Sequence, residues 1–305
     1  MEHVADIHDL GAPSRIAAVT FDATGRPIVF GSDDGQTFTA ERYDGSAWTT
    51  SDVTGTRALQ FLPGPVAIAG KGDSYDVWEL TDEASFAWTH YDVPSPPCSG
   101  SWRIVGIDAT GRYFAVVDGG SLVMFTWHAG DKDWVQVPDT SEAGFEQGAV
   151  VTPNGVAFLS FSPPDTENFD YQRIQDGAPA ALSPCAGEMT AISDNGVVDD
   201  ASDLFFEVCE LSALYVVPEG GTCYRKVADL PPDVCGLAGV APDGTAFIFP
   251  TTVGDGSILR LMPGATAWDT ITGEGIDGTS GFVARDATTL YRFGGNRPGL
   301  AEADL

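Results

Sequence analysis

Short apolar segments separated by turn-forming residues run along the whole chain, and helical periodicity is hard to find. One clear unit joins a strand-forming segment at residues 18–21 to another at 26–30 through the turn Asp-Ala-Thr-Gly at 22–25. β-Branched and aromatic residues favour strands, and a short turn of Asp, Asn and Gly between two such segments is typical of a β-hairpin. The pattern therefore predicts an all-β chain built from hairpins.

The same strand–turn–strand unit recurs along the sequence at nearly regular spacing. Its turns lie 39 to 48 residues apart, at positions 25, 64, 111, 155, 196, 244 and 288. A second landmark comes late in the unit, where an aromatic residue follows a turn at Trp48, Trp88, Trp134, Tyr224 and Trp268. We expect these side chains to begin outermost strands and to pack between neighbouring units. A repeat of roughly 40–50 residues made of short strands predicts a β-propeller, here with seven four-stranded blades.

The last repeat has too few residues for four strands, because only the segment near 300–305 remains for a strand after 291–293. The N-terminal segment 4–10 resembles the outer-strand segment 226–230, and we expect it to supply the missing strand and close the last blade. Closure removes free sheet edges. Six blades with an irregular appendage are the alternative. We expect a single domain over residues 1–305, with approximate blades at 16–54, 57–93, 102–138, 147–183, 188–229, 236–272, and 280–305 plus 4–10.

Glycine pairs and spaced aromatic residues give a family resemblance. The double glycines at 119–120 and 294–295 resemble those that end the second strand of kelch repeats. Trp127 and Trp134 are similar to the spaced aromatic pair of that repeat, and residues 31–38 resemble a degenerate Asp-box in an unusual turn. The resemblance implies a propeller of the kelch-like or Asp-box type. It implies no particular activity, because one fold hosts many functions.

The charge balance of the chain limits the classes of partner that it can bind. It carries 15 Lys and Arg against 44 Asp and Glu, a formal net charge of −29. Such a charge opposes binding to nucleic-acid phosphates or to an anionic membrane, because like charges would have to approach each other. The hydrophobic fraction of 43% is that of a packed chain. We expect an acidic, monomeric protein with neither a nucleic-acid nor a membrane partner.

The N-terminus and the cysteines bear on localisation. No apolar run reaches the roughly 18 residues of a membrane span, and residues 1–6 lack the regions of a signal peptide. A cytoplasmic protein fits this, and so does a mature secreted domain with an added initiator Met. Cys98, Cys185 and Cys235 fall at equivalent connections between blades, and Cys209 is expected near Cys185 or Cys235. One disulfide is therefore an open possibility.

The turns of a four-stranded antiparallel blade fall on two faces of a propeller. The first-to-second and third-to-fourth turns, which carry the regular Asp/Gly phrases, share one face, which we call the turn face. The second-to-third turns and the connections between blades share the other, which we call the loop face. Irregular segments map to the loop face at 95–102, 139–147, 162–170, 231–236 and 273–281. Variable loops on a rigid scaffold commonly carry binding sites, so the loop face is the predicted site.

Carboxylates with aromatic residues among them characterise the loop face. The predicted partner-binding residues are Trp102, Glu142, Phe145, Glu146, Asp165, Glu167 and Phe169. Such a surface suits a basic segment whose stems pack on aromatic rings while its charges meet Asp and Glu. We therefore expect a non-catalytic recognition or scaffold module that binds a protein or another ligand here. A solvated acidic rim without a ligand is the simpler alternative.

Sequence motifs for catalysis are missing. There is no G-x-S-x-G elbow, no S-x-x-K and no glycine-rich phosphate loop. Two further functions nevertheless stay open. One is a carboxylate-based hydrolase or lyase at the central channel, with or without Ca²⁺. The other is a carbohydrate-binding propeller, which should repeat its polar ligand residues from blade to blade.

Candidate metal ligands are few. The histidines form neither an HxH nor an HExxH arrangement, which gives poor support for a zinc or copper enzyme; they are His3, His8, His90 and His128. Residues 194–203 concentrate oxygen ligands of the kind that Ca²⁺ takes. The candidate Ca²⁺ ligands are Asp194, Asp199, Asp200 and Asp203. An acidic turn insertion is the alternative interpretation of this segment.

Overall fold

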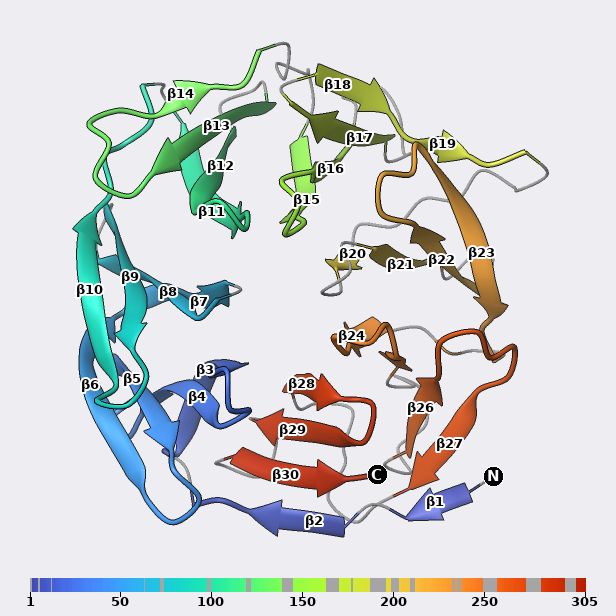
Figure 1. Ribbon diagram of the computed structural model, residues 1–305, viewed down its shortest axis with the longest axis horizontal. Helices are drawn as coiled ribbons and strands as arrows, with labels where there is room; N and C mark the ends of the chain where they lie inside the picture. The colour runs from blue at the N-terminus through green and yellow to red at the C-terminus, as the bar shows by residue number, and fades with distance from the viewer. Residues whose placement is uncertain are drawn as a thin grey trace. The chain divides into compact units, whose positions relative to one another are not determined.

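The chain folds as an all-β protein. The computed structural model describes residues 2–4, 6–11, 13–62, 64–71, 74–97, 100–118, 122–138, 145–162, 170–176, 178–186, 196–198, 203–208, 212–231, 234, 237–248, 257–272, 281–293 and 300–305. Over these residues there is no helix, and so none that could cross a membrane. The strands form seven four-stranded antiparallel blades arranged as a β-propeller (Figure 1). The predicted fold is confirmed, and the six-bladed alternative is wrong.

Contacts within the chain divide it into two compact units. The first unit comprises Met1–Val93, Val253–Ile258 and Thr270–Leu305, and the second comprises Pro94–Thr252 and Leu259–Asp269. Blades 1, 2 and 7 belong to the first unit and blades 3, 4 and 5 to the second. The strands of blade 6 are divided between the two.

The first unit holds three complete blades. Blade 1 consists of β3 (Arg15–Phe21), β4 (Pro27–Ser32), β5 (Phe38–Tyr43) and β6 (Trp48–Gly55). Blade 2 consists of β7 (Arg57–Leu62), β8 (Val66–Lys71), β9 (Ser74–Asp82) and β10 (Ala87–Asp92). Blade 7 consists of β28 (Gly281–Asp286), β29 (Thr289–Phe293), β30 (Leu300–Asp304) and β2 (Asp6–Asp9).

The second unit holds three more blades and part of blade 6. Blade 3 consists of β11 (Ser101–Ile107), β12 (Arg112–Asp118), β13 (Leu122–His128) and β14 (Val135–Gln136). Blade 4 consists of β15 (Phe145–Val151), β16 (Ala157–Ser162), β17 (Asp170–Gln175) and β18 (Ala178–Ala181). Blade 5 consists of β20 (Gly196–Val198), β21 (Leu204–Val208), β22 (Ala213–Val217) and β23 (Cys223–Asp229). Blade 6 consists of β24 (Leu237–Val240), β25 (Ala246–Ile248), β26 (Ser257–Leu261) and β27 (Asp269–Thr272).

The N-terminal segment closes the last blade, as predicted. β2 pairs antiparallel with β30, so that Asp6 lies opposite Asp304 and Asp9 opposite Ala301. The Leu10 amide continues the ladder by donating to the Leu300 carbonyl at 3.0 Å. Because β30 then has a partner on each side, blade 7 does not end on an unpaired edge at this strand.

One repeated turn lies elsewhere than predicted. Gly25, Gly111 and Gly244 occupy turns between first and second strands with φ near 80°, a left-handed conformation that glycine adopts at little cost. In blade 5, however, Gly196 opens strand β20 and pairs with Phe206. The connection from β20 to β21 is residues 199–203. The local text Ser-Asp-Asn-Gly suits a turn, but the strand pairing of the whole blade determines where the turn falls.

Two short parallel strands were not predicted. β19 (Ser183–Pro184) pairs with β23, and β1 (Glu2–Val4) pairs with β27, so that blades 5 and 6 each gain a fifth strand. Next to β19, Cys185 forms a disulfide with Cys223, with the two Cα atoms 5.0 Å apart. The expected proximity of Cys209 to Cys185 does not yield the disulfide of Cys185, because the parallel pairing of β19 with β23 places Cys223 beside it.

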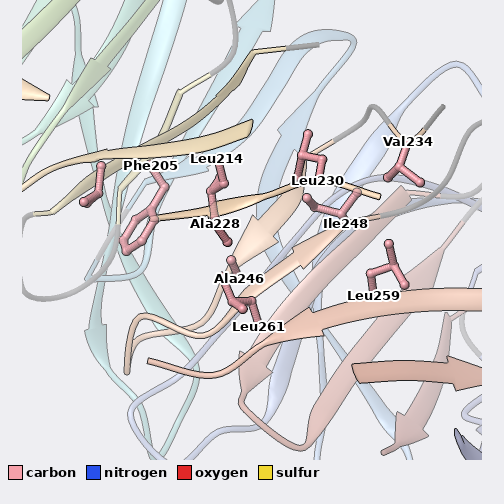
Figure 2. Packing of buried hydrophobic residues seen from close by; sticks show 10 residues of the cluster. Phe205, Leu214, Ala228, Leu230, Val234, Ala246, Ile248, Leu259 and Leu261 are labelled. Carbon is pink, nitrogen blue, oxygen red and sulfur yellow. The ribbon is translucent and has the colours of Figure 1, made fainter. Parts of the chain in front are cut away.

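The core consists of layers between successive blades. In the layer between blades 5 and 6, side chains from β21, β22 and β23 face those from β25 and β26 (Figure 2). The buried members are Phe205, Leu214, Val216, Ala228, Leu230, Val234, Ala246, Ile248, Leu259 and Leu261. Equivalent layers lie between blades 1 and 2, 3 and 4, 4 and 5, and 7 and 1. The members of one layer alternate along a strand, as Leu214 and Val216 do in β22, because successive residues point to opposite sides of a sheet.

The aromatic landmarks join neighbouring blades, as predicted. The indole N–H groups of Trp48, Trp134 and Trp268 donate to the carbonyls of Leu10, Pro94 and Asp229 at 3.0, 2.5 and 2.7 Å. Each acceptor lies at or just after the end of the fourth strand of the preceding blade. The regular spacing of these aromatic residues in the sequence thus reflects one repeated contact between blades.

Candidate functional site

Most of the predicted loop-face residues lie outside the described part of the chain. This holds for Glu142, Asp165, Glu167 and Phe169 and for the side chains of Phe145 and Glu146 in β15. Trp102 is described. It is half-buried at the start of β11, and its ring meets the buried ring of Trp134 edge-on, with centroids 5.9 Å apart. Part of the Trp102 surface is therefore used in packing. The role of the other predicted loop-face residues stays a prediction.

The candidate Ca²⁺ ligands are described only in part. Asp194, Asp199 and Asp200 lie outside the described residues. Asp203 is half-buried at the start of β21, where its carboxylate accepts a hydrogen bond from the Glu219 amide at 2.6 Å. This contact ties the first-to-second turn of blade 5 to its third-to-fourth turn. The Ca²⁺ site stays a prediction.

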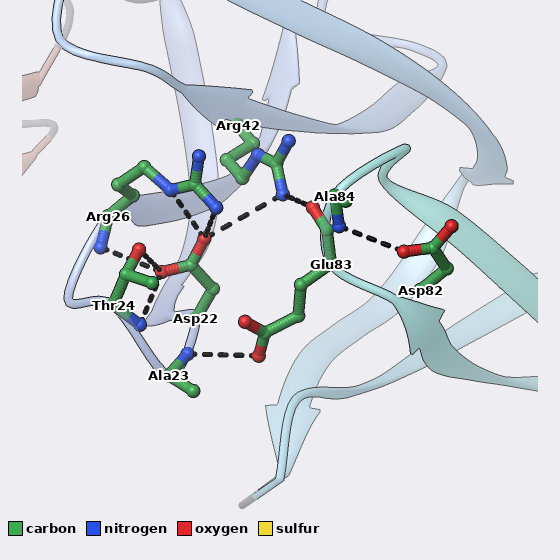
Figure 3. A network of polar contacts seen from close by, with 8 residues as sticks. All are labelled: Asp22, Ala23, Thr24, Arg26, Arg42, Asp82, Glu83 and Ala84. Atoms are coloured by element: carbon green, nitrogen blue, oxygen red, sulfur yellow. Dashed lines mark hydrogen bonds and ion pairs between the residues drawn. The ribbon is translucent and has the colours of Figure 1, made fainter.

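The aspartates of the repeated Asp-Ala-Thr-Gly turns are structural. The Asp22 carboxylate accepts hydrogen bonds from the Thr24 amide, the Thr24 hydroxyl and the Arg26 amide at 3.0, 2.7 and 3.0 Å (Figure 3). Asp108 accepts the same set from Thr110 and Arg112 at 2.9, 2.6 and 3.0 Å. Burial raises the pKa of both carboxyls, but these hydrogen bonds outweigh it, so each pKa lies below its ordinary value.

A buried arginine extends the Asp22 turn to the next blade. The Arg42 guanidinium donates to the Glu83 carbonyl and lies 3.7 Å from Asp22 Oδ2 (Figure 3). It also stacks over the Phe86 ring, 4.7 Å from the centroid. The Glu83 carboxylate in turn accepts from the Ala23 amide at 3.1 Å. These contacts hold the turns of blades 1 and 2 together and leave Asp22 no role toward a ligand.

A groove opens between blades 5 and 6 on the turn face. This groove 5/6 has a volume of about 450 Å³, within the range of roughly 300–1,000 Å³ typical of ligand pockets. Buried apolar side chains form its floor; they are Phe205, Leu214, Val216, Ala246 and Leu261. Its charged residues are Asp203 and Asp243 against Arg225. The turn residues 262–266 of blade 6 form one lip, with Met262 39% exposed.

A second groove, between blades 3 and 4, is built from equivalent positions. This groove 3/4 has a volume of about 190 Å³. Strand pairing defines the equivalence, since Phe114 pairs with Thr126 in blade 3 as Phe205 pairs with Val216 in blade 5. The equivalent lining residues are Phe114 and Phe205, Thr126 and Val216, Val135 and Arg225, and Ile174 and Leu261.

The two grooves differ at the residue two positions before the aromatic residue of the floor, Phe114 in groove 3/4 and Phe205 in groove 5/6. In groove 3/4 this residue is Arg112, whose guanidinium lies over the Phe114 ring, 4.9 Å from the centroid. Asp108 holds it there through a hydrogen bond of 2.9 Å to Nε. In groove 5/6 the equivalent residue is Asp203, a shorter side chain of opposite charge. Groove 3/4 is thus partly filled by its own arginine.

A histidine and two carboxylates meet on the outer hairpin of blade 2. Asp76 and Asp92 pair across β9 and β10, and His90 Nε2 lies 3.1 Å from Asp76 Oδ1 and 3.9 Å from Asp92 Oδ1. Potential ligand atoms of the three residues lie within 4.8 Å of one another, close enough to hold a metal ion. No local sequence pattern indicates this cluster, because strand pairing creates it. Because Asp92 is almost fully exposed, the contacts of this cluster lie at the surface and are of modest energetic value.

Comparisons with known proteins identify the architecture and nothing finer. No family model matches the chain, and no curated protein matches it. Virginiamycin B lyase from Staphylococcus aureus superposes with a TM-score of 0.64 at 10% identity, over 99% of each chain. A streptogramin B lyase gives 0.63 at 11% identity, over 99% of this chain and 97% of that one. YCF48 bound to D1 peptide gives 0.58 at 14% identity, over 99% and 96%.

At such identities the likeness shows the fold alone. These neighbours are lyase and YCF48 propellers, so they confirm a β-propeller and do not confirm the kelch-like resemblance. The fold hosts both catalytic and binding proteins, and function has to be argued from sites.

Proposed function

We propose that this propeller is a non-catalytic recognition module that binds a basic segment of another protein through its loop face. The observation that carries the proposal is the different placement of positive and negative side chains in the fold. Within the described residues, many arginines serve the interior of the fold, whereas exposed charges are mostly carboxylates. A partner therefore meets a strongly negative surface.

The arginines with internal roles pair with carboxylates of the same chain. These pairs are Arg26 with Asp22, Arg112 with Asp108, Arg260 with Asp269 and Arg285 with Asp286. Arg42, Arg173 and Arg292 are buried. Exposed carboxylates occur throughout the described residues; among them are Asp33, Asp44, Asp52, Asp92, Asp131, Asp133, Asp176, Glu219 and Asp243. With 44 acidic residues against 15 basic ones, this surface favours cationic partners through long-range attraction.

The similarity to YCF48 supports a peptide or protein as the ligand. That neighbour was solved with a D1 peptide, so a propeller of this architecture can bind a peptide. At 14% identity the comparison does not extend to individual residues. The proposed contact residues therefore remain those of the loop face: Trp102, Glu142, Phe145, Glu146, Asp165, Glu167 and Phe169.

Two observations favour recognition over the alternatives. A carbohydrate-binding propeller should repeat its polar ligands, whereas the equivalent grooves carry Arg112 in one place and Asp203 in the other. The two histidines whose side chains are described, His90 and His128, lie on a fourth and a third strand. These strands form the outer half of their blades, so neither histidine supports a catalytic site at the central channel. A lyase or hydrolase that uses channel carboxylates remains the second candidate, suggested by the lyase neighbours alone.

Binding kinetics on matched charge variants test the proposal. The loop-face variant combines Glu142→Gln, Glu146→Gln, Asp165→Asn and Glu167→Gln. The control variant makes the same charge change on exposed turn-face residues with Asp131→Asn, Asp133→Asn, Asp176→Asn and Glu219→Gln. The probe is an immobilised peptide of alternating Leu and Arg, and an alternating Leu and Glu peptide is the negative control. Association is measured by surface plasmon resonance at several salt concentrations.

Steering by loop-face charges predicts a clear difference between the variants. The loop-face variant should associate roughly tenfold more slowly than wild type, with a flatter salt dependence, because steering charges act mainly on the association rate. The control variant should stay within about twofold of wild type. Equal slowing of both variants would show attraction by net charge alone, and no slowing of either would show that the loop face is not the site. Either result contradicts the proposal.

A further inference from the structure

We infer that groove 5/6 binds an arginine side chain presented by a partner peptide, with the guanidinium stacked on Phe205. This groove lies on the turn face, opposite the predicted loop-face site, and the inference does not rest on the loop-face proposal. It rests on the comparison of two equivalent grooves within one chain.

In groove 3/4 the space above the aromatic floor is occupied by a guanidinium of the same chain. There the Arg112 guanidinium lies 4.9 Å from the centroid of the Phe114 ring and is held by the Asp108 carboxylate. A guanidinium over an aromatic ring is attracted by the negative face of the ring, and more strongly where water is excluded. Blade 3 therefore supplies from its own chain the cation that its aromatic floor favours.

Groove 5/6 keeps the aromatic floor but replaces this cation by a carboxylate. Phe205 occupies the position of Phe114, and Asp203 that of Arg112. Phe205 is 7% exposed, against 3% for Phe114. This is expected, because Asp203 stands at the position of Arg112 and no arginine there covers the Phe205 ring. The groove volume of about 450 Å³, against 190 Å³, leaves room for an incoming side chain.

The charges of groove 5/6 are complementary to a cation. Asp243 takes one hydrogen bond from the Thr245 amide at 3.0 Å, and an ionised carboxylate has capacity for several more. Asp203 adds a second carboxylate on the facing blade. Arg225 opposes them, but its side chain is exposed to solvent and is one positive charge against two negative ones. A planar guanidinium suits this arrangement better than an ammonium, because it stacks and donates at the same time.

Apolar surface beside the charges accommodates the rest of the ligand. Met262 and Pro263 are exposed on the lip, and Val227 is half-exposed on the opposite wall. Long basic side chains bury their methylene stems against such surface while the charged end meets a carboxylate. The occupant is therefore an arginine with apolar neighbours on an extended peptide.

The test uses a fluorescein-labelled Leu-Arg-Leu peptide with capped ends and the whole protein, with affinity measured by fluorescence polarisation. The matched probe replaces arginine by citrulline, which has nearly the same shape and no charge. Four variants are compared: Phe205→Leu, Asp203→Arg, Asp243→Asn and Arg225→Gln. The control variants are Phe114→Leu in groove 3/4 and the loop-face variant described above. Thermal midpoints verify that each variant is folded.

The inference predicts a distinct pattern. Phe205→Leu and Asp243→Asn should each weaken binding by about three- to tenfold, from loss of a cation–π contact or an ion pair. D203R should abolish binding, because it recreates in groove 5/6 the internal arginine of groove 3/4. Arg225→Gln should strengthen binding, because it removes the opposing charge.

Two results would overturn the inference. One is equal binding of the arginine and citrulline peptides. The other is a set of groove 5/6 variants that bind like wild type. Weakening by the loop-face variant alone would place the peptide on the loop face, which supports the proposed function and rejects groove 5/6. Weakening by Phe114→Leu to the same degree as Phe205→Leu would also reject it, because groove 3/4 is already filled.

Discussion

At the scale of single residues, the same side-chain type serves two purposes in this chain. Asp22 and Asp108 are almost completely buried acceptors that build turns, whereas most other carboxylates face solvent. The sequence distinguishes the two classes where the phrase Asp-Ala-Thr-Gly repeats, and hydrogen bonds within these turns show that their aspartates are structural. It does not show Arg42 reaching the Glu83 carbonyl, because that contact joins two blades.

The turn aspartates predict a loss of stability in acid. Hydrogen bonds hold the pKa of Asp22 and Asp108 below the ordinary 3.8 in the folded protein. Because the folded pKa is the lower one, this stabilisation is complete above 3.8 and is lost as the pH falls through and below that value. Asp22→Asn and Asp108→Asn should each lower the free energy of unfolding at neutral pH by about 1–3 kcal/mol. Each should also flatten the decline measured by urea unfolding between about pH 5 and pH 3.

The exposed Asp131 provides the control for this prediction. Asp131→Asn should leave both the stability and its pH dependence nearly unchanged. If Asp22→Asn retained the full decline in acid, other carboxylates would be responsible and the assignment would be wrong.

At the scale of elements, the blades could be predicted from the sequence. The extra strands β1 and β19 and the disulfide beside β19 could not. Six of the seven turn phrases and the aromatic landmarks marked the strands, since each reflects contacts inside a blade or between neighbours. β1 and β19 are too short to carry an alternating pattern, and their partners lie far away in sequence. The pairing of Cys185 with Cys223 follows from the parallel register of β19 and β23, which no local pattern indicates.

The N-terminal strand makes a testable contribution to stability. Deletion of residues 1–11 should remove β2, the Leu10 contact of Trp48 and the cover of the β30 edge. We expect a melting midpoint lower by many degrees and aggregation at high protein concentration, because exposed sheet edges pair with one another. Deletion of residues 1–4, which removes only β1, is the control and should have a small effect. An unchanged midpoint after the longer deletion would contradict closure by β2.

The disulfide between Cys185 and Cys223 should stabilise blade 5 and the segment before it. It closes a loop with a sequence separation of 38 residues, which corresponds to about 4 kcal/mol in the chain-entropy model. The double variant Cys185→Ser and Cys223→Ser should therefore unfold at a lower urea concentration. Dithiothreitol should shift wild type to the same midpoint and leave the double variant unaffected. A shift of the double variant by the reductant would point to another cystine.

At the scale of the whole molecule, the candidate grooves could not be predicted from the sequence. Groove 5/6 depends on the equivalence of Asp203 with Arg112, which strand pairing establishes. The repeat phrase aligned Gly196 with Gly111 and so placed Val197, not Asp203, opposite Arg112. The loop face stays a prediction from loop irregularity, which is visible in sequence, whereas a groove between two blades requires the register of both blades.

Net charge sets a further property of the whole molecule. With a formal charge of −29, the folded state is destabilised by self-repulsion at low salt. The melting temperature should rise as NaCl increases from roughly 0.01 to 0.1 M, where the Debye length falls from ~30 to ~10 Å. Thermal scans at constant pH measure this, and a flat response would contradict it.

A divalent ion separates screening from specific binding in the same scans. If Asp194, Asp199, Asp200 and Asp203 bind Ca²⁺, micromolar Ca²⁺ should raise the melting temperature more than Mg²⁺ at the same concentration. Equal small effects would leave screening as the whole explanation and would remove support for the Ca²⁺ site.

Closure of blade 7 by β2 also determines when this blade can be completed during synthesis. Asp6 pairs with Asp304, so β2 leaves the ribosome long before its partner β30 has been made. At about 5–20 residues per second, β2 waits roughly 15–60 s for β30. The waiting segment reads Asp-Ile-His-Asp, and its charged positions discourage pairing with another nascent chain. The acidity of this strand therefore protects the chain through the interval before β2 and β30 pair.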